Sequence, residues 1–162
     1  LDKMNNLGIL KFILLIFIVN FFDLFVGTFL IKYFLVIPLT FLFFSFYVYR
    51  QNHNVSPIFS FLIGIIVDLI SYTFIGLNGC LFCLMTYIIN NYSNTFKLFS
   101  YFQICIFFGL SAAFYVGFSH LFVNLGNFSY LTLFISAILN TLLFIIITMI
   151  NFYIPRTFIR KN

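Results

Sequence analysis

Six long apolar runs follow one another along the chain, separated by short polar or glycine-containing segments. They lack the strict alternation of apolar and polar residues that marks the strands of a membrane β-barrel. A membrane-spanning helix needs about 20 apolar residues. We therefore predict helices over residues 7–30, 34–49, 56–74, 77–95, 99–123 and 128–154. The connections are too short for a soluble domain, so residues 1–162 are predicted to form a single polytopic membrane domain.

Proline and glycine mark several boundaries of these runs. Pro38 interrupts the second run near its start, whereas Pro57 lies in the first turn of the third, where its missing N–H costs nothing. Gly76 predicts a tight turn between the third and fourth runs, and Pro155 follows the sixth. The first run is longer than the apolar part of a signal peptide and is followed by no A-x-A cleavage site, so we expect it to be retained.

The composition indicates that this chain lies in a lipid bilayer and not in water. Hydrophobic residues make up 64% of it and charged residues only 7%, against about 25% charged residues in ordinary soluble domains. A small soluble domain leaves too much of its surface exposed to hide such a sequence. In lipid the backbone must satisfy its own hydrogen bonds, which leaves helices once the barrel is excluded. The predicted class is an all-α membrane protein.

The basic residues predict an orientation. The net charge is +5, but the basic residues are too sparse and scattered to favour nucleic acid as a partner. With the N-terminus in the cytoplasm, seven of the eight basic residues lie on the cytoplasmic side, and only Lys32 lies outside. Five spans would move the basic C-terminal residues to the wrong side. The prediction is therefore six transmembrane helices in an inner membrane, with both termini in the cytoplasm. The seven residues are Lys3, Lys11, Arg50, Lys97, Arg156, Arg160 and Lys161.

Ionisable side chains within the apolar runs are candidates for function, because such groups are costly in a bilayer. Asp23, Asp68 and His120 all fall in the predicted outer half of the membrane and form a possible polar cluster. One interpretation is a cavity that binds a cation, a proton or a polar group of a partner. The other is that the acids bond to neighbouring helices and hold them together, while His120 is solvated at the interface.

The sequence lacks the motifs that catalysis or metal binding would need. Cys80 and Cys83 form a C-x-x-C within an apolar run, with no second pair to complete a zinc site. The chain has no H-E-x-x-H, no phosphate-binding loop and no Ser/His/Asp arrangement. Asp23 and Asp68 could imitate an aspartyl dyad, but glycine-rich flanks do not accompany both. We predict no catalytic residue, no metal and no cofactor.

The stretch from Phe61 to Leu81, FLIGIIVDLISYTFIGLNGCL, is the most informative part of the chain. Gly64 and Asp68 are four residues apart and therefore share a helix face. Gly64 allows another helix to approach closely, and Ser71 lies near enough along the same face to hydrogen-bond Asp68. With Gly76 at the turn and Asn78 at the start of the next helix, this stretch predicts a tightly packed hairpin around one buried acid.

This run has the form F-x-x-G-x-x-x-D-x-x-S-x-x-x-x-G-x-N and resembles the rod shape-determining protein MreD family. The matching residues are Phe61, Gly64, Asp68, Ser71, Gly76, Leu77 and Asn78. Chain length and the six-run layout also resemble that family. The resemblance implies a fold similar to the substrate-binding (S) component of energy-coupling-factor transporters. It also implies a non-enzymatic role in the elongation machinery that controls lateral peptidoglycan synthesis and cell shape.

The partners that the resemblance implies are an MreC-like bitopic membrane protein and, indirectly, an MreB-like filament, a RodA-like polymerase and a class B penicillin-binding protein. An alternative from another class is a small-molecule, vitamin-type transport component, with Asp23, Asp68 and His120 lining its pocket. Such a pocket needs several convergent polar groups, and few other mid-membrane candidates exist beyond Asn20 and Asn140.

Overall fold

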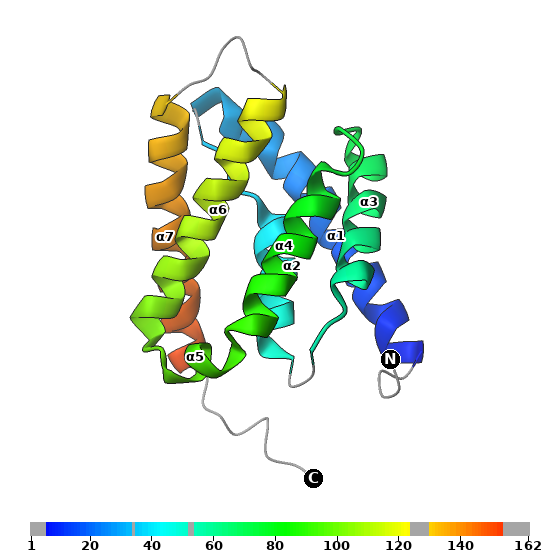
Figure 1. Ribbon diagram of the computed structural model, residues 1–162. Coiled ribbons are helices and arrows are strands. Elements are labelled where there is room, and N and C mark those ends of the chain that lie inside the picture. The colour runs from blue at the N-terminus through cyan, green and yellow to red at the C-terminus, as the bar shows by residue number, and fades with distance from the viewer. Residues whose placement is uncertain (1–5, 34, 52–53, 124–129, 154–162) are drawn as a thin grey trace.

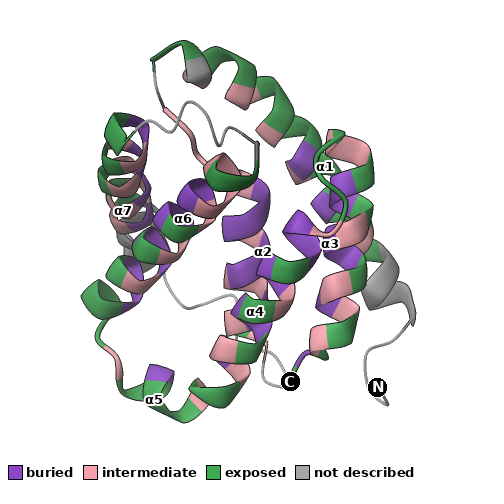
Figure 2. Ribbon diagram, turned by 45° about the horizontal axis from the view of Figure 1, so that its top comes forward, coloured by how far each residue is buried: buried purple, intermediate pink, exposed green. Residues whose placement is uncertain are grey.

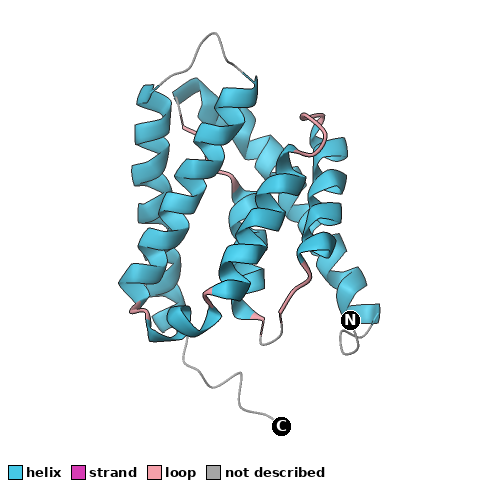
Figure 3. Cartoon of the chain, in the orientation of Figure 1, coloured by secondary structure: helices cyan, strands magenta, loops and turns pink. Residues whose placement is uncertain are grey.

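The computed structural model describes residues 6–33, 35–51, 54–123 and 130–153. Throughout these ranges the regular structure is helical, without a strand (Figure 3). The α-helices are α1 (Asn6–Leu30), α2 (Leu39–Arg50), α3 (Pro57–Ser71), α4 (Leu77–Asn91), α5 (Ser93–Leu98), α6 (Tyr101–Val123) and α7 (Tyr130–Tyr153), and a 3-10 turn, η1 (Ile31–Tyr33), follows α1. Helices thus occupy each of the six predicted apolar ranges.

Two helical hairpins are joined through α2. Helix α3 packs along α4, and α6 packs along α7, while α2 contacts α1, α4 and α6. Figure 1 shows the α6–α7 hairpin beside the α3–α4 hairpin, with α1 running obliquely behind. The α6–α7 hairpin therefore meets the remaining helices mainly through α2, and α4 and α6 stay apart over much of their length.

Helix α2 begins five residues later than the predicted range of 34–49. Residues 35–38 are not helical, and the helix starts at Leu39, directly after Pro38. The reason is local, because proline disfavours helical backbone in the residue before it and lacks the N–H that would bond to the preceding turn. A stretch of non-helical backbone therefore precedes the central helix.

The fourth predicted range, 77–95, also differs from the structure. Helix α4 ends at Asn91, and α5 is a separate short helix that connects α4 to α6 (Figure 1). Phe96 of α5 is buried and its ring lies 4.7 Å from that of Phe107 of α6. The buried phenyl ring fixes this short helix beneath the ends of its neighbours.

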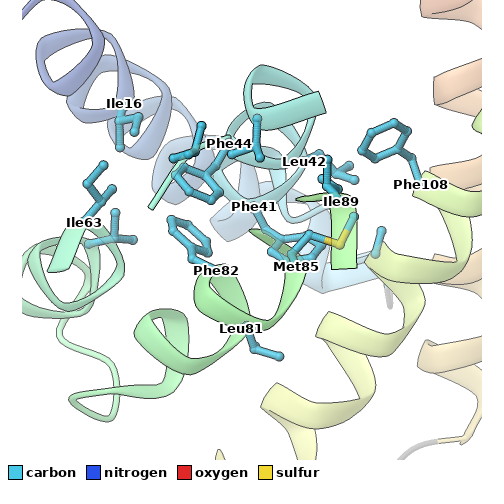
Figure 4. Packing of buried hydrophobic residues seen from close by; sticks show 14 of the residues in the cluster. Ile16, Phe41, Leu42, Phe44, Ile63, Leu81, Phe82, Met85, Ile89 and Phe108 are labelled. Atoms are coloured by element: carbon cyan, nitrogen blue, oxygen red, sulfur yellow. The ribbon is translucent and has the colours of Figure 1, made fainter. Parts of the chain in front are cut away.

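Aromatic rings fill the centre of the protein. The ring of Phe44 on α2 stacks on that of Phe82 on α4, with centroids 4.3 Å apart, and both residues are fully buried (Figure 4). Phe12 of α1 stacks on Tyr47 at 3.6 Å. Offset or stacked aromatic pairs of this kind stabilise a core beyond the area they bury. Helices α1, α2 and α4 are thereby held in one core.

The outer surface is apolar as well. Large side chains such as Phe21, Leu110 and Phe134, on three different helices, are 72%, 61% and 67% exposed. Figure 2 shows that buried faces point inward while exposed faces surround the molecule. Exposed apolar surface of this extent is unfavourable in water and favourable in lipid.

Two described stretches are long and apolar enough to cross a membrane, Lys11–Leu30 and Tyr101–Phe122. Three further apolar helical stretches are shorter: Leu39–Arg50, Pro57–Ser71 and Tyr130–Ile146. Helix α2 is short because it starts after Pro38, and the backbone groups at such a helix start need partners inside the protein.

Candidate functional site

Gly64 of α3 lies directly against the backbone of α4. A Cβ atom placed on Gly64 would lie 2.5 Å from both the Cα and the N atom of Gly79. Gly79 in turn faces the ring of Phe61, which a Cβ atom there would meet at 3.1 Å. The close helix approach expected from Gly64 is present, and it uses glycine on both helices.

Asp68 is fully buried at the end of α3 and organises the turn that follows. Its carboxylate accepts hydrogen bonds from the hydroxyl of Thr73 at 2.8 Å and from the backbone N–H of Gly76 at 2.9 Å. Asn78 donates twice, through its backbone N–H at 3.1 Å and its Nδ2 at 2.7 Å. All of these partners are donors, so the carboxyl group acts as the common acceptor for the turn.

The turn itself uses two residues with positive φ. Tyr72 has φ of 52° and Gly76 has φ of 97°. Gly76 adopts this conformation without steric cost, whereas Tyr72 does so at some strain. The backbone N–H of Tyr72 bonds to the carbonyl of Asp68, and Leu77 then begins α4 as a buried residue. The loop spans more residues than the two-residue turn predicted at 75–76.

Asn78 connects Asp68 to the α6–α7 hairpin through hydrogen bonds. Its Oδ1 accepts a 2.6 Å hydrogen bond from the hydroxyl of Tyr115 on α6. The Nδ2 group donates to Asp68 while Oδ1 accepts from Tyr115, so both ends of the amide are engaged. The ring of Tyr115 also packs on Phe41 of α2, with centroids 4.8 Å apart. One polar chain therefore links α3, α4 and α6.

The prediction that Ser71 hydrogen-bonds to Asp68 is wrong. Ser71 instead pairs with Asn20 of α1, with a distance of 3.0 Å from Asn20 Nδ2 to Ser71 Oγ. Thr73, two residues beyond, supplies the hydroxyl that Asp68 accepts. Ser71 ends α3 and faces α1, so it stabilises a contact between helices and is not part of the Asp68 cluster.

Asp23 caps the N-terminus of α2. Its carboxylate accepts hydrogen bonds from the backbone N–H of Leu39 at 3.2 Å and of Thr40 at 2.9 Å, and from the Thr40 hydroxyl at 2.7 Å. The N-cap residue of α2, Pro38, supplies no side-chain bond. A carboxylate is favourable at a helix N-terminus, where free N–H groups and the helix dipole attract negative charge.

Two side chains of α7 hold the segment before α2: Asn140, one of the further mid-membrane polar residues noted in the sequence, and Ser136, which was not among them. The hydroxyl of Ser136 accepts from the N–H of Val36 at 3.3 Å, and Nδ2 of Asn140 donates to the carbonyl of Val36 at 3.2 Å. Ser136 and Asn140 are four residues apart and so share a helix face. That spacing is visible in the sequence, but no sequence pattern indicates that non-helical backbone lies opposite it.

His120 is not joined to Asp23 or Asp68 by any of the hydrogen bonds in the described residues. It lies near the end of α6, half-buried, and its buried Nδ1 has no hydrogen-bond partner there. Asp23 thus binds the start of α2 and Asp68 binds the α3–α4 turn, and the possible cluster of these acids with His120 stays a prediction.

This arrangement favours a structural use of polar groups. Within the described ranges, no three His, Cys, Asp or Glu side chains come together to hold a metal ion. Both acids are engaged by donors from their own chain, so each satisfies helix ends that lipid would leave unpaired. The interpretation in which the acids hold the helices together fits these contacts, and we find no support for a vitamin-type pocket lined by them.

The fold and the site define an all-helical membrane protein whose buried acids bind its own backbone. The chain belongs to the MreD family: the family model described as rod shape-determining protein MreD matches residues 5–153, nearly the whole chain. This membership confirms the resemblance that rested on the Phe61–Asn78 run. Comparison with curated proteins and with solved structures gave no match. The likeness to the transporter S component therefore stays a prediction.

Proposed function

We propose that this protein is a non-enzymatic membrane subunit of the bacterial elongation machinery, which scaffolds lateral peptidoglycan synthesis together with an MreC-like bitopic partner. Membership of the rod shape-determining family supports a role in cell shape. The scaffold mechanism rests on one observation: the carboxylate of Asp68 is fully buried and accepts hydrogen bonds only from its own hairpin in the described residues. An acid used in this way stabilises the fold of the α3–α4 hairpin instead of binding a substrate.

In this proposal the protein crosses the inner membrane six times with both termini in the cytoplasm. The distribution of basic residues supports that orientation. Reporter fusions placed after Arg50 and after Lys97 should give cytoplasmic signals, and a fusion after Lys32 a periplasmic one. A periplasmic signal at Arg50 or Lys97 would overturn the orientation without bearing on the role in cell shape.

Depletion of the protein in its rod-shaped host tests the role itself. Loss of the scaffold should make cells round while the uptake of vitamins stays unchanged, because wall synthesis is no longer confined to the lateral wall. Cells of normal width would contradict the proposal, whatever the effect on uptake. Re-expression of the wild-type protein should restore rods and serves as the control for depletion.

Co-purification tests the bitopic partner. A tagged wild-type protein should retain the MreC-like protein in mild detergent, and Asp68→Ala should weaken that retention more than Ser71→Ala. Both variants remove one polar side chain near the end of α3, but only Asp68 orders the α3–α4 turn. Retention of the partner by neither the wild-type protein nor the variants would refute the partnership.

A further inference from the structure

An apolar recess separates α4 from α6. Its volume is about 270 Å³, and its lining comes from α2, α4 and α6: Phe41, Leu81, Leu84, Met85, Ile88, Phe107, Leu110, Ser111 and Phe114. Phe41, Leu81 and Met85 form a buried floor, whereas Leu84, Leu110 and Phe114 on the rim are 46%, 61% and 52% exposed. In Figure 4, Leu81 and Met85 project from α4 on the side of α6. The recess therefore opens to the surface that faces lipid.

The lining excludes a polar ligand. Ser111 is its one polar residue, and the Ser111 hydroxyl already donates to the carbonyl of Phe108 at 2.8 Å. Only van der Waals contact and the burial of apolar surface remain to favour binding in the recess. An apolar chain is the chemistry that fits such a surface.

The two ends of the recess differ. At one end, the hydrogen bond from Tyr115 to Asn78 crosses from α6 to α4, and Phe41 of the floor packs on Tyr115. At the other end, Phe107 of the lining packs on Phe96 of α5. The next residue, Lys97, is exposed, and Figure 1 shows α5 running between the ends of α4 and α6. A basic residue therefore follows directly, along the chain, the residue that contacts this end of the recess.

We propose that this recess binds an acyl chain of an anionic phospholipid whose phosphate group lies at Lys97. The proposed orientation, with the N-terminus in the cytoplasm, places Lys97 of α5 on the cytoplasmic side. The lipid therefore belongs to the inner leaflet. The assignment depends on the recess and on Lys97, and is independent of the role in cell shape.

The recess suits a slender apolar chain. A methylene group needs about as much space as a water molecule, roughly 30 Å³, so a recess of about 270 Å³ holds a segment of several methylenes. The lipid-preference experiment below decides between this occupant and a side chain of a partner helix.

The chain contains no tryptophan, so a single introduced tryptophan reports on its neighbouring lipid. Leu110→Trp places the reporter at the rim, and Leu142→Trp places a matched reporter on the exposed face of α7. Each purified full-length variant is reconstituted in phosphatidylcholine vesicles. Quenching is then measured with phosphatidylglycerol or phosphatidylcholine brominated in the acyl chains.

The Leu110→Trp reporter should favour phosphatidylglycerol over phosphatidylcholine by at least about fivefold, the effect of one basic residue near a lipid surface. The Leu142→Trp reporter should show little preference. Adding Lys97→Gln should lower the preference at Leu110→Trp about fivefold, whereas Lys11→Gln, which removes an exposed lysine of α1, should leave it unchanged.

Three results would overturn the assignment. Equal preferences at the two reporter positions would remove the special lipid at the recess. An equal effect of Lys97→Gln and Lys11→Gln would remove the link to Lys97. An unchanged preference in Ser111→Phe, which fills the recess, would show that the chain lies elsewhere, provided that the emission spectrum confirms a folded protein.

Discussion

Replacement of Gly64 by alanine tests the close packing at the centre of the α3–α4 hairpin. The added Cβ atom would lie 2.5 Å from two backbone atoms of Gly79, and backbone cannot rotate out of the way as a side chain can. Since carbon atoms pack at about 3.5 Å or more, the two helices must separate by about 1 Å.

The energetic cost follows from two opposing effects. Overpacking a well-packed core costs about 1–3 kcal/mol, and a backbone contact places this site at the upper end. Alanine gains up to about 1 kcal/mol over glycine in intrinsic helix propensity. The net expectation is a loss of about 2 kcal/mol in the free energy of unfolding. Separation of the helices should also weaken the bonds that Asp68 accepts from across the turn.

Gly27→Ala is the matched control. Gly27 also lies within a helix, but a Cβ atom there would meet nothing within 4 Å. The same substitution should therefore stabilise slightly, by up to about 1 kcal/mol. Unfolding of both variants can be followed in bicelles by steric trapping. Stabilities within about 0.5 kcal/mol of one another would refute the argument from close approach, because helix propensity alone would then explain both.

Three further substitutions have expected outcomes in the same unfolding assay. Asp68→Ala leaves both buried donors of Asn78 unpaired and should cost about 3 kcal/mol, whereas Asp23→Ala removes a helix cap and should cost about 1 kcal/mol; equal, wild-type-like stability of both variants would contradict this order. Tyr115→Phe removes one bond between helices and should cost about 0.6 kcal/mol. In the Asp68→Ala background that cost should shrink, because Asn78 is no longer held in position, and strict additivity would argue against the coupling.

The hairpin from Phe61 to Leu81 is the part of the site that the sequence predicted best. Gly64 was selected because small residues let membrane helices approach closely, and Asp68 because ionisable residues are rare in an apolar helix. Gly64 contacts Gly79, and Asp68 is buried in the turn as the spacing suggested. The donors to Asp68 were partly misassigned, since Thr73 takes the place given to Ser71.

The polar contacts between distant parts of the chain were beyond the reach of sequence reasoning. Asp23 binds Thr40, Tyr115 binds Asn78, and Val36 binds Ser136 across 100 residues of sequence. The signal that pairs helices in soluble proteins is a single apolar face, but α1 and α6 have no face that is distinctly more apolar than the rest. Pattern alone therefore cannot say which helices are neighbours.

The sequence by itself determined that this chain is an all-helical membrane protein, because its apolar runs leave no other way to satisfy the backbone in lipid. The spacing of Gly64, Asp68 and Gly76 in one hairpin also indicated the family, which the match over residues 5–153 confirms. Only the tertiary structure decided what the buried acids do. Helix α2 starts inside the fold after Pro38, so its free N–H groups need an acceptor, and Asp23 of α1 is the carboxylate that packing brings there.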